Sequence, residues 1–208
     1  QIADIAGGSL HSVIGILAAV IERQRSGLGQ YIDISMTDCV VGLSSMAAAA
    51  SLAGQEKQGP EQSYLNGATF YDYYETQDGR YLSIGSLEPQ FLHGLAQILE
   101  LPIVAEKGAS LATEDRQVVK QAIKDKIKTQ DFATWNAIFQ QQDVCVEPVL
   151  KLDEALDSQL AKDRAWVVSV PLQEGSTKSE QQLACPIKFS RSKIRYEFIG
   201  KPLGFDSL

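Results

Sequence analysis

The 208-residue sequence predicts an α/β protein made of amphipathic helices and a few short strands. Three observations support this fold class. Apolar residues recur at helical spacing through much of the first fifty residues. Residues 70–84 form two strand-like runs around an Asp-Gly pair, which is typical of a β-hairpin. Beyond residue 113, charged segments with helical periodicity alternate with short extended runs.

The first part of the chain predicts a helix, a strand and a second helix. Residues 9–25 carry Val, Ile and Leu at helical spacing and begin with a serine, a favourable N-cap. Residues 30–35 alternate and are rich in Ile and Tyr, which predicts a short strand. Residues 36–53 predict a second helix, with Ser35 or Thr37 as its N-cap.

The second part begins with the hairpin at residues 70–84. Pro89 then suits the first turn of a helix, because its missing N–H would be unpaired there in any case. A charged amphipathic helix is expected from residue 113, with Val118, Ile123 and Ile127 on its apolar face.

Shorter elements complete the chain. Residues 132–139 predict a helix with an aromatic face. Residues 144–150 predict a strand at the edge of a sheet, because Pro148 cannot donate a ladder hydrogen bond. Residues 152–161 predict a helix introduced by two acidic residues. The remainder is expected to be mostly extended.

These elements suggest a division of the chain into four parts. The polar stretch after the second helix, with its Gly-Pro pair, is typical of a linker. The predicted parts are a helix-and-strand region at residues 1–54, a linker at 55–69, a small α/β domain at 70–165 and an extended segment at 166–208.

Composition excludes several classes of function. The net charge of −7 argues against sequence-independent binding of nucleic acid, which needs basic patches. Three widely spaced cysteines and two histidines predict neither a metal site nor disulfides, and favour the cytoplasm. Cys39 and Cys145 are expected in the core. We predict no membrane-spanning segment, because the most apolar region, residues 39–53, is too short. The chain starts with Gln1, so we expect it to be part of something longer.

Two carboxylates stand at predicted helix entries in Gly-rich surroundings. Asp4 is followed by Gly7, and Glu88 is preceded by Gly85 and Leu87. Carboxylates at such junctions can transfer protons, and the small residues let a ligand approach, so the glycines and Leu87 are candidate substrate contacts. Spacing alone favours a simpler interpretation, in which each carboxylate stabilises a helix N-terminus. His11 and His93 belong to no recognisable catalytic motif.

Several segments, in this order and at this spacing, resemble family III CoA-transferases of the CaiB/BaiF type. The Glu-Pro-Gln-Phe element is similar to the branch of 2-methylacyl-CoA racemases. The resemblance covers nearly the whole chain. The segments that carry it are residues 4–9, 15–19, 22–23, 26–33, 72–76, 78–79, 85, 88–91, 143–150 and 153–154.

The resemblance implies the C-terminal portion of the family fold, without its N-terminal half. Residues 1–54 would belong to a large Rossmann-like domain that binds CoA, and residues 70–165 to the small α/β domain. Residues 166–208 would return toward the large domain. Family members are interlocked homodimers, and no cofactor is implied beyond the CoA that the substrate carries.

The resemblance also implies a reaction. In the racemases an aspartate and a histidine–glutamate pair flank the α-carbon of the acyl-CoA, and Asp4 and Glu88 match the two acidic positions. The histidine belongs to an upstream Gly-His-Asp motif that this sequence does not contain. One alternative is a CoA-transferase in which Asp4 is the nucleophile of a covalent acyl-enzyme. Another is a truncated, non-catalytic domain.

Overall fold

The structure, a computed structural model, describes residues 1–54, 59 and 61–201. Its mixture of helices and strands confirms the predicted α/β class. The predicted linker at 55–69 lies partly outside the described residues, and so does the end of the predicted extended segment at 166–208.

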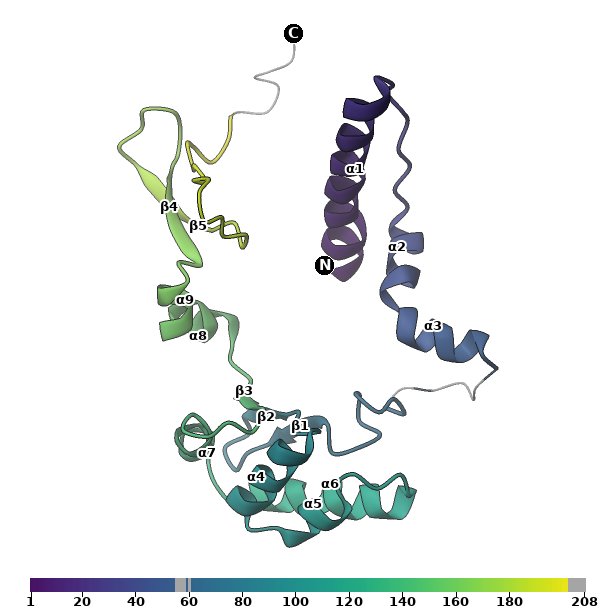
Figure 1. Ribbon diagram of the computed structural model, residues 1–208. Helices are drawn as coiled ribbons and strands as arrows, with labels where there is room; N and C mark the ends of the chain where they lie inside the picture. Colours follow the sequence, from purple (N-terminus) through teal and green to yellow (C-terminus); the bar gives the residue numbers. More distant parts are fainter. Residues whose placement is uncertain (55–58, 60, 202–208) are drawn as a thin grey trace. The chain divides into compact units, whose positions relative to one another are not determined.

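The chain divides into two units, Gln1–Asp72 (unit 1) and Tyr73–Leu208 (unit 2) (Figure 1). Each unit has its own internal packing and is described separately below. The predicted division into four parts stays a prediction.

Unit 1 begins with one continuous helical stretch. The π-helical segment η1 (Ile2–Leu10) runs directly into α1 (His11–Ser26). This stretch ends at Gly27, whose φ of 78° is a left-handed conformation that glycine adopts without strain. The helices α2 (Met36–Leu43) and α3 (Ser45–Leu52) follow.

The predicted start of the first helix, at Ser9, is wrong. The helical stretch begins seven residues earlier, and Ser9 lies inside it, where its hydroxyl donates to the Asp4 carbonyl (3.1 Å). Gly7 and Gly8 do not break the helix, because tertiary contact outweighs their weak helix propensity. At Gly7, a Cβ atom would lie only 3.1 Å from Val40 of α2, so the glycine permits this close packing.

The predicted strand at residues 30–35 is also not formed. The segment has no paired strand among the residues that the structure describes. Instead, Ile32 and Ile34 pack on α1, where a Cβ added to Gly15 would lie 3.2 and 3.3 Å from their side chains. The alternation of apolar residues therefore reflects one face of an extended segment that packs on a helix. A β-strand would also need a neighbouring strand to pair with its backbone N–H and C=O groups.

The predicted helix at residues 36–53 is present as two helices. Ser35 is the N-cap, as one of the two alternatives proposed, and its hydroxyl accepts a hydrogen bond from the Asp38 N–H (3.3 Å). The interruption falls at Ser44, whose hydroxyl donates to the Val40 carbonyl (3.2 Å). Such back-bonding competes with regular helical hydrogen bonds and bends helices.

Large apolar side chains on most sides of the first helical stretch are exposed, including Val13 and Leu17. Within the described part of the chain, Ile2–Ser26 is long and apolar enough to cross a membrane, judged by length and composition. The sequence-based search for a spanning segment had singled out residues 39–53 and so overlooked the stronger candidate. Because large exposed apolar surfaces usually mark contacts, we expect part of this surface to be covered in the functional molecule.

Unit 2 is built on a three-stranded sheet with the order β1-β2-β3 (Figure 1). The strands are β1 (Asp72–Glu75), β2 (Tyr81–Ile84) and β3 (Val146–Pro148). β3 runs antiparallel to β2, with Ile84 opposite Val146. The hairpin and the edge strand were therefore predicted correctly.

Four helices supply much of the remaining core of unit 2. They are α4 (Pro89–Leu99), α5 (Pro102–Lys107), α6 (Thr113–Ile127) and α7 (Phe132–Phe139). The core side chains that are almost completely buried include Leu82, Ile84, Leu95, Leu99, Val119, Ile123, Ile127 and Trp135.

The predicted apolar face of α6 was correct at Ile123 and Ile127 but wrong at Val118. Val118 is 48% exposed, whereas its neighbour Val119 is 1% exposed. Successive helical residues differ by about 100° around the axis, so the burial of Val119 turns Val118 toward solvent.

The last elements form a helix pair and a hairpin. The predicted helix at residues 152–161 is split by Ser158 into α8 (Leu152–Asp157) and α9 (Gln159–Asp163). The Ser158 hydroxyl caps α9 by accepting from the Ala161 N–H (3.1 Å). In the predicted extended segment, β4 (Val167–Pro171) pairs antiparallel with β5 (Ser179–Leu183).

Asp78 joins the hairpin turn to α7, and this junction predicts a pH dependence of stability. Its carboxylate accepts from the Thr76 hydroxyl (2.6 Å) and from the Phe132 N–H (3.0 Å). The Thr76 hydrogen bond first, and then the Phe132 hydrogen bond, hold the pKa of Asp78 below its ordinary value. A depressed pKa stabilises the fold above the unfolded-state pKa of about 3.9, and this contribution disappears as the pH falls through the folded-state pKa.

Asp78→Asn is therefore expected to lower the urea midpoint of unit 2 at pH 7, and this deficit should be smaller at pH 3, below the unfolded-state pKa of about 3.9. The measurement is urea unfolding at a series of pH values. Asp143→Asn, a change at an exposed carboxylate without a described hydrogen bond, is the control and should leave the pH dependence unchanged. An Asp78→Asn deficit that is equally large at both pH values would contradict the prediction.

Candidate active-site residues

The five predicted site residues fall into two groups. Asp4 and Gly7 lie in η1 of unit 1, and Gly85, Leu87 and Glu88 lie between β2 and α4 of unit 2. Each group is described within its own unit.

Asp4 lies in the first turn of η1, not before the helix as the sequence suggested. It is exposed, and its carboxylate makes no hydrogen bond or ion pair with the residues that the structure describes. Gly7 lies one turn further on and is buried, where a Cβ atom would come within 3.3 Å of the Met36 carbonyl oxygen. This contact fixes the turn that carries Asp4 against α2. Whether Gly7 also contacts substrate stays a prediction.

Glu88 is the N-cap residue of α4 and is exposed. Its backbone is extended, with φ −68° and ψ 144°, and its carboxylate does not cap the helix that it precedes. Within the described part of the chain, this carboxylate has no hydrogen bond or ion pair. It is therefore available to a ligand.

The loop that carries Glu88 is fastened to the segment before β3. The hydroxyl of Ser86, a fully buried residue, donates to the Val144 carbonyl. The Gly85 N–H donates to the Cys145 carbonyl (2.9 Å). The two hydrogen bonds bring residues 85–86 against residues 144–145, and so fix the direction in which the chain enters α4.

The far side of this segment packs on α4 itself. A Cβ atom at Gly94 would lie 2.7 Å from Val144 Cγ1, closer than two carbons can approach, so only glycine allows the helix to sit this near. Val144 is thus held by Ser86 on one side and by α4 on the other. The loop that carries Glu88 is therefore held by contacts on both sides of Val144.

Cys145 is exposed, which corrects the prediction that it is a core residue. Its φ of 52° is unusual for a residue with a side chain. Loss of hydration first, and then the negative charges of Glu88, Asp143 and Glu147, raise the pKa of the Cys145 thiol. The thiol therefore stays protonated at neutral pH, which makes it a poor nucleophile, and it lies in the electrostatic field of Glu88.

Neither histidine supports Glu88. His93 hydrogen-bonds through Nδ1 to the Pro89 carbonyl of its own helix (2.6 Å), and His11 does the same with the Ala6 carbonyl (2.6 Å). Each ring is therefore oriented by local helix backbone. This agrees with the absence of a catalytic motif around either residue in the sequence.

Sequence reasoning missed two contributors to this site, Ser86 and Cys145. Nothing in the local sequence pattern distinguishes the buried hydroxyl of Ser86 from an exposed one. Its partner lies 58 residues away in the chain, so only the fold reveals the contact.

The segments that carry Asp4 and Glu88 both lie within the match to a known protein family. Residues 1–207 match the family model described as CoA-transferase family III. The chain belongs to CoA-transferase family III.

Curated relatives in this family include enzymes of two named activities. The mouse α-methylacyl-CoA racemase is 38% identical over 169 residues, which cover 81% of this chain and 44% of the mouse protein. The human racemase is 32% identical over 178 residues, which cover 85% of this chain and 46% of the human protein. The succinyl-CoA:mesaconate CoA-transferase of Haloarcula hispanica is 27% identical over 186 residues, which cover 87% of this chain and 46% of the transferase. The chain spans about half the length of these relatives.

Solved structures share the fold. A CAIB/BAIF family protein from Brucella suis gives a TM-score of 0.67 at 23% identity, and covers 94% of this chain and 50% of that one. Rv3272 from M. tuberculosis gives a TM-score of 0.68 at 16% identity, and the match covers 91% of this chain and 50% of that one. At these identities the likeness concerns the fold alone.

Proposed function

We propose that this protein is a 2-methylacyl-CoA racemase that acts by removing and returning the α-proton of an acyl-CoA thioester. The proposal is supported by the mouse and human relatives, which are named as racemases and are more similar to this chain than the transferase is. The observation that carries it is Glu88, an exposed carboxylate without a protein partner among the described residues, on a loop that Ser86 fastens to Val144.

The proposed reaction has two proton transfers. A base on one face of the α-carbon takes the proton, and the electron pair of the C–H bond moves into the thioester to give an enolate. An acid on the opposite face then returns a proton to carbon, which inverts the centre and regenerates the thioester. We assign Asp4 to one face, and to the other a histidine that family members carry upstream, supported by the charge of Glu88.

Backbone amides can stabilise the enolate oxygen in this proposal. Asp4 lies in the first turn of a helix, where the first N–H groups have no partner within the helix. Such groups, together with the helix dipole, favour a developing negative charge. The proposal includes no cofactor beyond the CoA of the substrate, a homodimer as the active species, and a cytoplasmic location.

A CoA-transferase is the second candidate, favoured by the family description and by the Haloarcula relative. In this case Asp4 attacks the thioester carbonyl, CoA leaves as a thiolate, and an acyl-aspartyl anhydride forms. The CoA thiolate then attacks the aspartyl carbonyl and releases the donor acid. The acceptor carboxylate displaces CoA from the aspartyl thioester to form a second anhydride, and CoA takes the acceptor acyl group from it, which frees Asp4. Glu88 has no assigned role in this sequence of steps.

Deuterium exchange distinguishes the two candidates. The 208-residue chain, and in parallel the full open reading frame that encodes it, are incubated with 2-methylacyl-CoA in heavy water without an acceptor acid. Mass spectrometry then follows deuterium at the α-carbon. The racemase proposal requires incorporation by at least the full-length product. A folded product that binds CoA but exchanges no proton, and is trapped by hydroxylamine as an Asp4 hydroxamate, would establish the transferase instead.

The third candidate is that the 208-residue chain alone is a non-catalytic domain. This candidate is considered because the chain spans about half the length of its relatives. Calorimetry with CoA tests this reading separately. Binding of CoA by the full-length product but not by the 208-residue chain would support a domain that does not bind the ligand on its own.

A further inference from the structure

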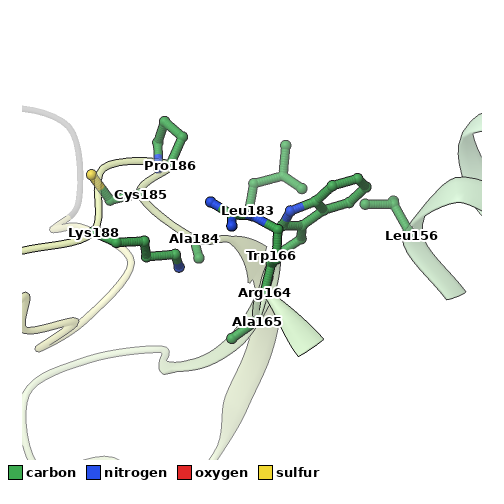
Figure 2. Close-up of a pocket in the computed structure, with 9 residues that line it drawn as sticks. All are labelled: Leu156, Arg164, Ala165, Trp166, Leu183, Ala184, Cys185, Pro186 and Lys188. Carbon is green, nitrogen blue, oxygen red and sulfur yellow. The ribbon is translucent and has the colours of Figure 1, made fainter. Parts of the chain in front are cut away.

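A pocket of about 410 Å³ lies where α9 meets the β4–β5 hairpin, entirely within unit 2 (Figure 2). Its size falls within the range of about 300–1,000 Å³ that is usual for small-molecule sites. The residues that give it its character are Leu156, Arg164, Trp166, Leu183, Pro186 and Lys188. None of the candidate active-site residues lines it.

The pocket walls are held by backbone hydrogen bonds. Trp166 follows Ala165, a non-glycine residue with a φ of 48°, and its N–H donates to the Ala161 carbonyl of α9 (3.0 Å). The Trp166 carbonyl accepts from the Ala184 N–H (2.8 Å), which ties the indole to the end of β5. The opposite rim is fixed by the Tyr196 hydroxyl, which accepts from the Cys185 N–H (2.8 Å). The cavity is therefore formed before any ligand arrives.

Most of the lining is apolar, and the indole of Trp166 is its largest surface. Figure 2 shows the end of Leu156 directed at the indole, with Pro186 and Lys188 on the other side of the ring. Leu183 adds a second aliphatic wall. Such a lining favours the body of a ligand that is itself aliphatic or aromatic.

The charged side chains that line the pocket are both cations. Arg164 and Lys188 line it, and no carboxylate does. Among the described residues, neither cation makes an ion pair or a side-chain hydrogen bond, and the indole N–H of Trp166 has no acceptor. Elsewhere in unit 2, exposed cations such as Lys107 and Lys162 are paired with aspartates. Within the described part of the chain, Arg164 and Lys188 thus place two unpaired positive charges beside an apolar cavity.

We propose that this pocket binds an organic monocarboxylate with an apolar body. The body packs between the Trp166 indole and the aliphatic side chains, and the carboxylate accepts hydrogen bonds from Arg164 and Lys188. Arginine pairs with carboxylates through two parallel hydrogen bonds, which fixes the orientation of the ligand. The inference rests on unit 2 alone and does not depend on the proposed racemase activity.

Octanoate is the probe, and isothermal titration with the 208-residue chain is the first measurement. Acetate has the same head without the body, and 1-octanol has the body without the charge. Both are expected to bind at least about tenfold more weakly, because each lacks one of the two contributions. Equal binding of octanol and octanoate would overturn the proposal, as would the absence of octanoate binding at millimolar concentration.

Substitutions locate the site. Arg164→Met and Lys188→Met are each expected to weaken octanoate binding about tenfold, because each removes one charge-assisted hydrogen bond. Both side chains are exposed, so the thermal midpoint should not change. Lys178→Met is the matched control: it removes the same charge from an exposed residue of the hairpin that does not line the pocket. Equal weakening by all three variants would show a non-specific charge effect and refute the proposed site.

A spectroscopic measurement tests the position directly. The chain has two tryptophans, so its proton–nitrogen NMR spectrum should show two indole N–H signals. Octanoate is expected to shift the signal of Trp166 and leave that of Trp135, which is buried and donates to the Ile127 carbonyl (2.8 Å). The signals are assigned with Trp166→Phe. A shift confined to Trp135, or to neither tryptophan, would refute the proposed site.

Discussion

Glu88→Gln is expected to lower α-proton exchange in 2-methylacyl-CoA at least about 100-fold, because acid–base groups commonly contribute factors of about 100 to 10,000. The substitution keeps the size of the side chain and removes its charge, which the proposal needs to stabilise the protonated base that faces it. The measurement is the rate of deuterium incorporation by the full-length product, together with its pH profile.

The structure makes this variant a clean test of chemistry. The Glu88 side chain does not cap α4 and has no described partner, so the free energy of unfolding should change by less than about 0.5 kcal/mol. Glu147→Gln is the matched control, because Glu147 is a nearby exposed carboxylate in β3 to which no catalytic role is assigned. Near-normal exchange in Glu88→Gln would refute the racemase assignment, and loss of exchange in both variants would point to a general charge effect.

Trp135→Ala is expected to lower the free energy of unfolding of unit 2 by about 3–5 kcal/mol, the usual cost of truncating a buried tryptophan. Trp135 is 1% exposed, and its ring stacks on Phe139 with centroids 5.6 Å apart. The change also leaves the Ile127 carbonyl without its indole donor. Because whole domains are stable by only about 5–15 kcal/mol, this variant should be largely unfolded at modest urea concentration.

Two controls accompany this measurement. Trp135→Phe keeps an aromatic ring and removes the N–H, so it should cost clearly less than the alanine variant. Val118→Ala lies on α6 at a side chain that is 48% exposed, and should change stability by less than about 0.5 kcal/mol. A cost below about 1 kcal/mol for Trp135→Ala would mean that α7 does not pack in solution as described.

Unit 2 was largely predictable from local patterns. The Asp-Gly turn, Pro89 at the start of α4 and the acidic residues at the start of α6 are local signals that act within a few residues. Pro148 at an edge strand is a similar case. Such signals reflect backbone geometry and hydrogen bonding between near neighbours, and the structure confirms these four elements.

Unit 1 was less predictable, because its pattern has two physical explanations. Residues 30–35 alternate as a strand does, yet they pack on α1 at Gly15 and have no described strand partner. The helix began at Ile2, although Gly7 and Gly8 are poor helix formers, because Gly7 fits closely against α2. In both cases a contact between distant residues outweighed a weak local preference.

The order and spacing of the sequence motifs were enough to place the chain in its family, because such motifs can be recognised without knowing which residues touch. The resemblance then made Asp4 and Glu88 the candidate acidic residues. The tertiary structure decided which groups surround them. It put Ser86 against Val144, exposed Cys145 near Glu88, and assembled a pocket around Trp166 from segments up to 32 residues apart. Burial and pairing arise from contacts between segments far apart in sequence, and no local pattern of residues specifies them.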